Sequence, residues 1–237
     1  MKLSIIIPVY NEEKTIDSVF EEVSLAKIPN VEKEIIVVDD GSSDNSKFKI
    51  QNSKLPGIKK IFHEKNQGKG VAVRTGIEHA TGKYILIQDA DLEYNPKDIE
   101  RLLEPIKHNN GKVVVYGSRL KRPPNFSKDE RTFQFFMHYI GNKFLSLLTS
   151  ILYGQWITDM ETGYKLFPKT SLKDIRLSSK NFDFEPEITA KLLKRGYKIV
   201  EVPITTNPRG YKEGKKLNTF KDGSIALWTL LKYRVVD

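Results

Sequence analysis

The 237-residue sequence contains no cysteine, and this absence excludes several classes of site. Without thiols the chain forms neither a disulfide scaffold nor a zinc or iron–sulfur centre with cysteine ligands, and its composition is compatible with a reducing cytoplasm. Histidine is also scarce: the full set is His63, His79, His108 and His138, whose spacing is not that of a metal site. We therefore do not expect a metal centre built on thiols or imidazoles.

Long hydrophobic runs are missing as well. No stretch reaches the roughly 18 uninterrupted apolar residues of a membrane span. The first residues run directly into Pro8 and the acidic pair Glu12 and Glu13, so the features of a signal peptide are not present. The expectation is a chain that does not cross a membrane and works in the cytoplasm.

Two common phosphate-binding motifs are also missing. The segment 68–70, Gly-Lys-Gly, has neither the glycine spacing nor the Lys-Ser/Thr ending of a P-loop, and no dinucleotide fingerprint occurs. Taken alone, these glycines are more typical of a flexible helix entry than of a ligand contact. No internal repeat, low-complexity tract or linker interrupts the chain, which favours a single domain over residues 1–237.

Basic residues are in excess. The 39 Lys and Arg against 30 Asp and Glu give a formal charge of +9, which suits a nucleotide diphosphate, an anionic lipid surface or a nucleic acid. A nucleic-acid binder would cluster its basic residues with exposed aromatics, whereas here they are spread along the whole chain. Nucleic acid is therefore not an expected partner.

Short apolar runs alternate with helical patterns in the first half of the chain. Predicted strands cover residues 3–9, 34–38, 59–62, 84–87 and 113–116. Between them, Asn11 is predicted to cap a first helix, Ser42 or Ser43 a second over about 44–53, and Pro96 to open another. Alternation of this kind predicts an α/β fold with a mostly parallel central sheet and helices on both faces.

The second half has a different character. A long helix is predicted over 132–153, with a break near Gly141. Further strands and helices are predicted in 157–167, 184–195, 198–202 and 219–233. These elements are expected to pack onto the first layer.

The stretch from Lys83 to Pro96 is the centre of the functional prediction. A buried strand over 84–87 ends in Asp89 and Asp91, and ligands of open α/β sheets bind at the carboxyl ends of strands. Two neighbouring carboxylates favour a cation, and Mg²⁺ or Mn²⁺ suits carboxylate oxygens and substrate phosphates. A solvated turn or helix cap is the alternative explanation of the same pattern.

Four motifs in this order resemble family 2 glycosyltransferases of the GT-A fold. They are residues 4–12 (SIIIPVYNE), 34–44 (EIIVVDDGSSD), 66–70 with Ala72 and Arg74 (NQGKG), and 88–91 (QDAD). The resemblance covers about residues 3–120 and implies a nucleotide-sugar-binding half, 1–120, followed by an acceptor-side half, 121–237. The segments 159–165 (DMETGYK) and 201–204 (EVPI) are similar to dolichyl-phosphate mannose synthases and related polyprenyl-phosphate glycosyltransferases.

The resemblance implies roles for individual residues. Those implied to contact the nucleotide sugar are Pro8, Tyr10, Glu12, Asp39 or Asp40, Lys69, and the run Gln88, Asp89, Ala90 and Asp91. Asp91 is the primary candidate ligand of Mg²⁺ or Mn²⁺, with Glu93 as a further one. Asp89 is expected to hold the ribose or to orient the site.

The implied reaction is inverting transfer of one sugar from GDP-mannose or a UDP-hexose to a polyprenyl phosphate. Arg119 and Arg131 are candidate phosphate clamps, because a guanidinium matches two phosphate oxygens. Arg209 and Lys215 belong to a basic segment that could close over the diphosphate. The alternatives are a soluble or glycan hydroxyl acceptor, for which Asp159 or Glu161 is the candidate base, and a sugar nucleotidyltransferase.

An apolar stripe in the long helix suggests how a lipid acceptor is reached. Its members recur at helical spacing: Phe133, Phe136, Met137, Ile140, Phe144, Leu147, Leu148 and Ile151. Cations flank this segment and the carboxy-terminal helix with Trp228, which is the composition of an interfacial helix. Core packing is the other explanation. The explanation as an interfacial helix predicts a peripheral protein on the cytoplasmic face of an anionic membrane.

Overall fold

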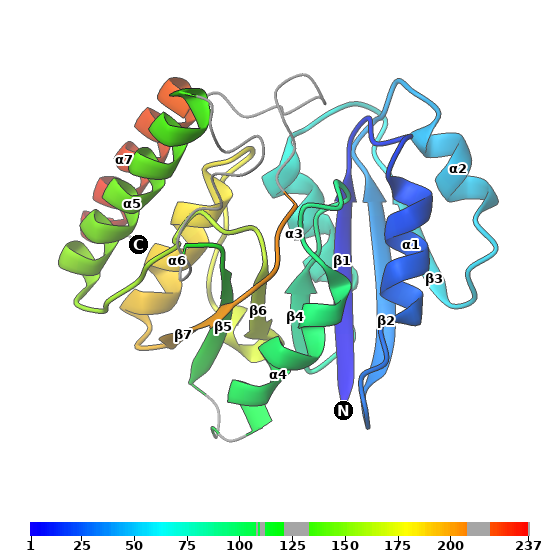
Figure 1. The fold of residues 1–237 in the computed structure, drawn as a ribbon, viewed down its shortest axis with the longest axis horizontal. Coiled ribbons are helices and arrows are strands. Elements are labelled where there is room, and N and C mark those ends of the chain that lie inside the picture. The colour runs from blue at the N-terminus through cyan, green and yellow to red at the C-terminus, as the bar shows by residue number, and fades with distance from the viewer. Residues whose placement is uncertain (108, 110–111, 121–132, 208–218, 237) are drawn as a thin grey trace.

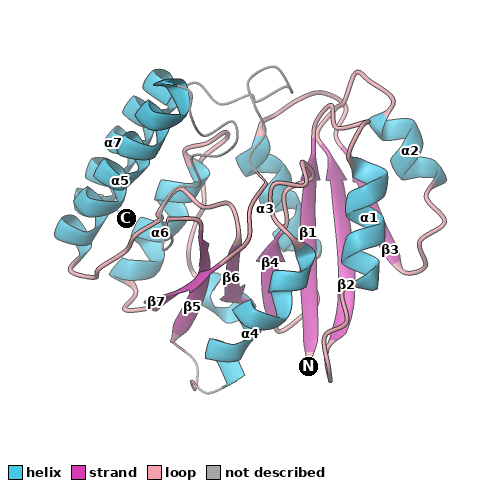
Figure 2. Cartoon of the chain, in the orientation of Figure 1, coloured by secondary structure: helices cyan, strands magenta, loops and turns pink. Residues whose placement is uncertain are grey.

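The computed structural model describes residues 1–107, 109, 112–120, 133–207 and 219–236, and these residues form a central sheet covered by helices (Figures 1 and 2). The strands are β1 (Lys2–Val9), β2 (Glu32–Asp39), β3 (Ile58–Phe62), β4 (Tyr84–Ile87), β5 (Val113–Ser118), β6 (Lys165–Pro168) and β7 (Lys198–Pro203). The helices are α1 (Ile16–Leu25), α2 (Ser46–Asn52), α3 (Lys69–His79), α4 (Ile99–Lys107), α5 (Phe133–Tyr153), α6 (Phe184–Lys194) and α7 (Thr219–Val235), with short 3₁₀ turns η1 (Pro96–Asp98) and η3 (Lys169–Leu172).

The sheet is mostly parallel, as the sequence predicts. Its strand order is β3-β2-β1-β4-β6-β5-β7, and only β6 runs antiparallel to its neighbours β4 and β5. The chain extends from β1 through β2 to β3 in one direction and then returns to place β4 on the other side of β1. A crevice therefore opens at the carboxyl ends of β1 and β4, which is where open α/β sheets bind ligands.

Alternating side chains of the strands form two separate cores. In β1, Ile5 and Ile7 point to one face, where they pack with residues of α1, α2 and α4. Ile6 points to the other face, towards residues of α3, α5, α6 and α7. Strand residues alternate between faces with a period of two, so each buried strand needs apolar residues at consecutive positions. This explains the continuous isoleucine run of β1.

The predictions of the first two helix caps are wrong. Asn11 lies in the left-handed region at φ 52°, and its side-chain oxygen accepts a hydrogen bond from Ser43 N at 2.8 Å. It thus fastens the loop after β1 to the loop after β2, and α1 begins only at Ile16. Helix α2 begins at Ser46, whose N–H is bound by the Asp44 side chain at 2.9 Å.

Helix α5 continues through Gly141 without a break, contrary to the prediction. Its two faces are reversed relative to an ordinary surface helix. The inward face is largely polar, with Asn142, Ser146 and Thr149 buried, whereas the outward face is apolar. The outward residues and their exposed fractions are Phe136 (52%), Ile140 (45%), Phe144 (57%), Leu147 (46%) and Ile151 (70%). Packing of the apolar stripe into the core therefore does not explain these outward residues.

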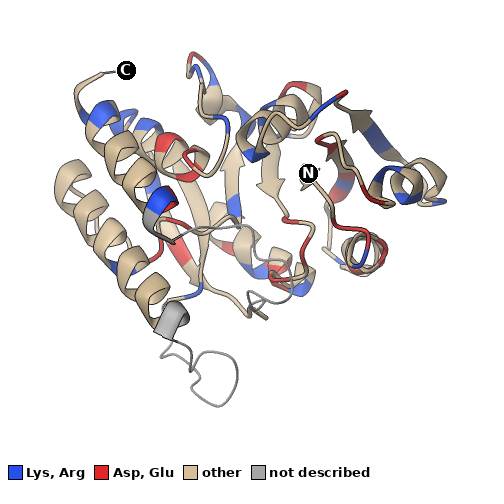
Figure 3. Cartoon of the chain, turned by 90° about the horizontal axis from the view of Figure 1, so that it is seen from above, with Lys and Arg blue, Asp and Glu red and all other residues tan. Residues whose placement is uncertain are grey.

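Helix α7 lies beside α5 at one end of the molecule (Figure 1) and extends the exposed apolar surface. Further exposed apolar residues are Ile225, Trp228, Leu231 and Val235 of α7 and Trp156 after α5, and together with the outward residues of α5 we call them the α5/α7 face. Figure 3 shows that these outer helices carry few charged side chains. In the part of the chain that the structure describes, no helix is both long and apolar enough to span a membrane.

Candidate active site

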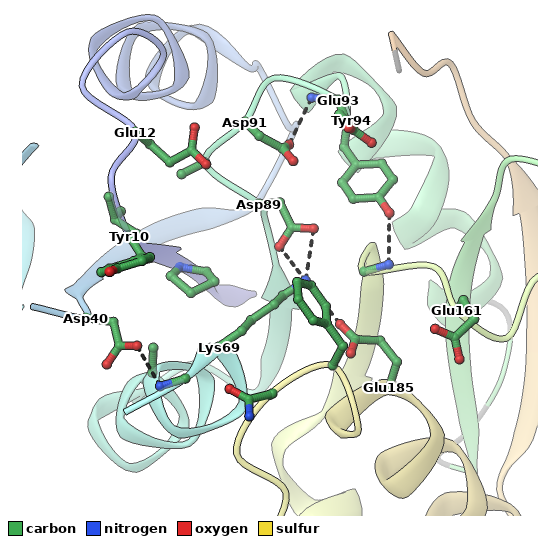
Figure 4. A pocket seen from close by; sticks show the side chains of 18 of the residues that line it. Tyr10, Glu12, Asp40, Lys69, Asp89, Asp91, Glu93, Tyr94, Glu161 and Glu185 are labelled. Atoms are coloured by element: carbon green, nitrogen blue, oxygen red, sulfur yellow. Dashed lines mark hydrogen bonds and ion pairs between the residues drawn. The ribbon is translucent and has the colours of Figure 1, made fainter. Parts of the chain in front are cut away.

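A cavity of about 370 Å³ lies at the carboxyl ends of β1 and β4 (Figure 4). The residues of the sequence prediction that line it are Pro8, Tyr10, Glu12, Asp40, Lys69, Asp89, Ala90, Asp91, Glu93 and Arg119. The loops after β1, β2, β3 and β4 and the end of β5 bring these residues together. Asp39, Gln88 and Asp159 are buried beside the cavity rather than on its wall, and Arg131, Arg209 and Lys215 lie outside the described residues.

Lys69 joins two carboxylates in the floor of the cavity. Its Nζ lies 2.9 Å from Asp89 Oδ1 and 3.0 Å from Glu185 Oε1, so it connects the loop after β4 with the first turn of α6. Burial disfavours the charge, but Asp89 and Glu185 outweigh it and raise the pKa of Lys69 well above its ordinary value. Lys69 is therefore a permanent cation. Asp89 is thus part of an ion pair at the cavity floor, and its expected role in holding the ribose or orienting the site stays a prediction.

Asp91 and Glu93 stand on the same wall, beyond Asp89 (Figure 4). Asp91 Oδ1 accepts a hydrogen bond from Glu93 N at 3.1 Å, and this turn places both carboxylates at the cavity. Carboxylate oxygens are hard donors that suit Mg²⁺ and Mn²⁺, which usually complete their shells with water and substrate phosphate. No group of three or more acidic or imidazole side chains converges on a metal position within the described ranges. The two carboxylates thus fit an ion that is held jointly with a phosphate.

Asp39 and Asp40 differ in what they bind. Asp40 lines the cavity and accepts hydrogen bonds from Gln67 N and Gly68 N, at 3.0 and 2.8 Å, and contacts His63 Nδ1 at 2.6 Å. It therefore anchors the loop that leads into α3. Asp39 is fully buried, and its Oδ1 has no hydrogen-bond partner among the described residues. Asp40 is thus on the cavity wall, and Asp39 is buried beside it.

Arg119 enters the cavity from the end of β5 and is held by Asp159. Its Nε and Nη2 lie 2.9 and 2.7 Å from the two carboxylate oxygens, and Asn142 Nδ2 binds the same Asp159 at 3.0 Å. Burial opposes ionisation of Asp159, but Arg119 lowers its pKa below the ordinary value. Asp159 is consequently a stable anion that orients Arg119. Among the described residues no hydrogen bond is made by Arg119 Nη1, so this group can meet an anion in the cavity.

Glu161 lines the far end of the cavity, two residues after Asp159. Burial and then the neighbouring Glu185 raise its pKa to about 8. Lys165 fixes the backbone on both sides of it, because its Nζ donates to Met160 O at 2.9 Å and to Thr162 O. Of the two candidate bases for a hydroxyl acceptor, Glu161 is the better placed. It lines the cavity, whereas both carboxylate oxygens of Asp159 are bound by Arg119.

Glycine is required at position 163 by a close approach. A Cβ there would lie 2.5 Å from Asp89 Oδ2 and 3.2 Å from Lys69 Nζ. The Gly163 N–H also donates to Tyr94 Oη at 2.9 Å. The loop before β6 can therefore press against the Asp89–Lys69 pair only because it lacks a side chain here.

Several lining residues were not predicted as site residues. They are Val9, Asn66, Gly68, Ala72, Tyr94, His138, Gly163, Asn181, Phe182 and Glu185, together with Glu161, which was considered only as a base. Asn66, Gly68 and Ala72 belong to a motif that the resemblance used. Glu185 and Phe182 precede or begin α6, and no local pattern separates them from the ordinary acidic start of a helix.

Comparison with known proteins agrees with this architecture. Solved structures of glucosyl-3-phosphoglycerate synthase from Mycobacterium tuberculosis superpose with a TM-score of 0.75 for a UDP complex, at 18% identity, and cover 100% of this chain and 81% of the other. A complex of that enzyme with Mn²⁺, UDP and glucosyl-3-phosphoglycerate gives a TM-score of 0.73 at 19% identity. At this identity the likeness defines the fold, which is the GT-A fold of glycosyltransferases.

The family follows from sequence similarity. Residues 4–176 match the model of glycosyl transferase family 2, and the chain belongs to this family. A UDP-N-acetylglucosamine–dolichyl-phosphate N-acetylglucosaminyltransferase of Methanococcus voltae is 34% identical over 234 residues, covering 90% of this chain and 89% of the relative. A dolichol-phosphate mannosyltransferase of Pyrococcus furiosus is 32% identical over 225 residues, with 91% of this chain and 59% of the relative covered. The protein is thus a glycosyltransferase, and the nucleotidyltransferase alternative is set aside.

Proposed function

We propose that the protein transfers one sugar, with inversion, from a nucleotide diphosphate sugar to a polyprenyl phosphate. The observation that carries this proposal is the placement of a guanidinium, Arg119, in the same cavity as the carboxylates Asp91 and Glu93. The acidic wall can share a cation with the diphosphate of the donor. The cationic group can bind the phosphate of the acceptor, so the cavity has a place for both substrates. The curated relatives named above support the choice of acceptor.

The donor would lie along the cavity with its base and ribose near Tyr10 and Asp40, as the resemblance implies for the first two motifs. Its diphosphate would then reach Asp91 and Glu93, which would hold the divalent ion. When bound, that ion supplies Lewis-acid stabilisation of the charge that develops on the leaving diphosphate. Lys69 holds Asp89 beside this position through their ion pair.

The acceptor phosphate needs no strong base. A phosphate monoester with a second pKa of about 6 is already largely anionic near neutral pH. One of its oxygens attacks the anomeric carbon while the bond from that carbon to the diphosphate breaks, and a single displacement of this kind inverts the anomeric configuration. Arg119 would position the attacking phosphate through Nη1, since Nε and Nη2 are bound to Asp159.

A transfer assay tests the acceptor class. Purified protein with Mn²⁺ and radiolabelled UDP-glucose, UDP-N-acetylglucosamine or GDP-mannose should label a polyprenyl phosphate that partitions into organic solvent, and EDTA should abolish the labelling. The matched control acceptor is the corresponding polyprenol, which lacks the anionic nucleophile and should remain unlabelled. Equal labelling of the polyprenol, or labelling only of soluble hydroxyl acceptors, would contradict the proposal.

The α5/α7 face would bring this cavity to the lipid. Five apolar residues of α5 point outward while its polar residues point inward, so the helix exposes its apolar face to solvent. Lys143 on α5 and Lys232 and Arg234 on α7 add positive charge beside the apolar surface. Buried apolar area and attraction to anionic headgroups together bind interfacial helices to membranes. We therefore assign this face to the surface of an anionic membrane.

Sedimentation with vesicles tests this assignment. The protein should sediment with vesicles that contain phosphatidylglycerol and less so in high salt, because salt screens attraction to the headgroups. The double variant Phe136→Ser and Phe144→Ser should lose most of this binding and keep its thermal unfolding temperature, since both side chains are already half exposed.

Phe48→Ser is the matched control, because Phe48 is 66% exposed on α2, at the other end of the molecule (Figure 1). It should bind vesicles as the wild type does. Wild-type indifference to vesicles at low salt would contradict the membrane assignment. So would concentration-dependent self-association that the double variant abolishes, because the face would then be an interface between copies.

A further inference from the structure

Two glutamates at the far end of the cavity each carry a buried oxygen without a partner. Among the described residues, Glu161 Oε1 and Glu185 Oε2 make no hydrogen bond, although both residues line the cavity. Glu185 is only 4% exposed. Buried side-chain oxygens of native proteins nearly always have a partner, so such a pair at one cavity wall indicates a ligand.

The Glu185 side chain and the backbone around Glu161 are held in place by neighbours that do not occupy these oxygens. Lys69 binds Glu185 through Oε1 and leaves Oε2 without a partner among the described residues. The backbone around Glu161 is fixed by the two carbonyl contacts of Lys165 and by the Gly163–Tyr94 hydrogen bond. The Glu185 acceptor is thus fixed in advance, which lowers the entropic cost of binding a ligand there.

The location of the pair indicates what that ligand is. Figure 4 shows Tyr10 and Asp40 at one end of the cavity, Asp89 and Asp91 in the middle, and Glu161 and Glu185 at the other end. A donor with its nucleoside at the first end and its diphosphate at Asp91 directs its sugar towards the glutamates. Sugar hydroxyls both donate and accept hydrogen bonds, so they can satisfy a carboxyl group in either protonation state.

We propose that Glu161 and Glu185 form the subsite for the transferred sugar and bind hydroxyl or amide N–H groups of a neutral hexose or N-acetylhexosamine. This inference rests on the proposed function, because it takes the orientation of the donor from it. The two residues bind the donor sugar directly. They confer affinity for the sugar and none for the nucleoside diphosphate.

Calorimetry can separate these contributions by comparing each nucleotide sugar with its own nucleotide. Wild-type protein with Mn²⁺ is titrated with UDP, UDP-glucose and UDP-N-acetylglucosamine, and with GDP and GDP-mannose. For the nucleotide that binds, one nucleotide sugar should bind more tightly than the bare diphosphate. Glu161→Met, which keeps the size and removes the acceptor, should lower the affinity for that nucleotide sugar by about two- to tenfold, the loss of one hydrogen bond. The affinity for the diphosphate should not change.

Glu185→Gln is the second variant, because an amide can keep the oxygen that faces Lys69 and replaces the unpaired acceptor by a donor. It should also reduce the sugar's contribution to binding and spare the diphosphate. Glu100→Met, at an exposed position on α4, is the matched control and should bind all ligands as the wild type does.

The outcomes distinguish this inference from the proposed function. If no nucleoside diphosphate binds the wild type, the proposed function is contradicted together with the inference. If the diphosphates bind but the sugar adds no affinity, or if both variants keep the added affinity, only the inference is overturned. If Glu161→Met lowers turnover while the nucleotide sugar binds normally, Glu161 is a base for a hydroxyl acceptor and not a sugar-binding group.

Discussion

Asp91→Asn should abolish both transfer and the metal dependence of nucleotide binding while leaving the fold intact. The change removes one negative charge and keeps the shape and the Oδ1 acceptor that binds Glu93 N. A bound cation contributes several kcal/mol to stabilising the leaving group, and about 4 kcal/mol corresponds to roughly a 1,000-fold loss of rate. Asp91 is the carboxylate at the cavity for this role, because Asp89 is already bound by Lys69.

Binding measurements give this prediction a readout besides activity. Titration of the wild type with UDP or GDP should show tighter binding with Mn²⁺ than with EDTA, and the variant should lose that difference and unfold at the wild-type temperature. Asp17→Asn, at an exposed position on α1, is the control and should change neither quantity. Near wild-type transfer by Asp91→Asn would refute the assignment of Asp91 as a metal ligand.

Glu93→Gln tests the second carboxylate in the same titration. A smaller loss of the Mn²⁺ effect than in Asp91→Asn would make Glu93 an accessory ligand. An unchanged Mn²⁺ effect would remove it from the metal site altogether.

The sequence predicts which polar residues of the first half of the chain come together at the cavity, because the pattern that places them is local. The strand pattern and the turn residues after β1, β2 and β4 occur within short segments, and parallel strands bring their carboxyl ends together. Asp89 and Asp91 follow directly from where the apolar run of β4 stops. The positions of Asp89 and Asp91 can therefore be predicted without knowing which distant segments pack against them.

The other side of the cavity depends on tertiary contacts that leave no local pattern. Glu185 reaches Lys69 only because α6 packs on the sheet beside α3, and Gly70 N binds Lys180 O at 2.8 Å to hold the two segments together. In sequence, Glu185 is one more acidic residue in the first turn of a helix.

Helix α5 shows a different limit of the sequence. Its apolar spacing was visible, but the direction in which the stripe points was not. The polar face turns inward because Asn142 binds Asp159 and Ser146 Oγ accepts from Met160 N at 2.9 Å. These hydrogen bonds to the loop that carries Asp159 fix which side of the helix faces inward.

Lys69→Met should damage both stability and turnover, because it leaves Asp89 and Glu185 without their common cation. Breaking a buried ion pair by removing one partner typically costs about 3–5 kcal/mol. For a chain of this size the unfolding temperature should fall by about 10 °C. Turnover should drop by about 100-fold, since small displacements of groups that position a substrate have effects of this order.

The exposed pair between Lys107 and Glu104 on α4 provides the matched control. Its atoms are also close, at 2.6 Å, but the two side chains are 40% and 49% exposed, so Lys107→Met should change stability by less than about 1 kcal/mol. The double variant Lys69→Met with Glu185→Gln removes one of the stranded charges and should recover part of the stability without recovering turnover. Full recovery of turnover in the double variant would show that Lys69 serves only to neutralise Glu185. Its ion pair with Asp89 would then have no part in the reaction.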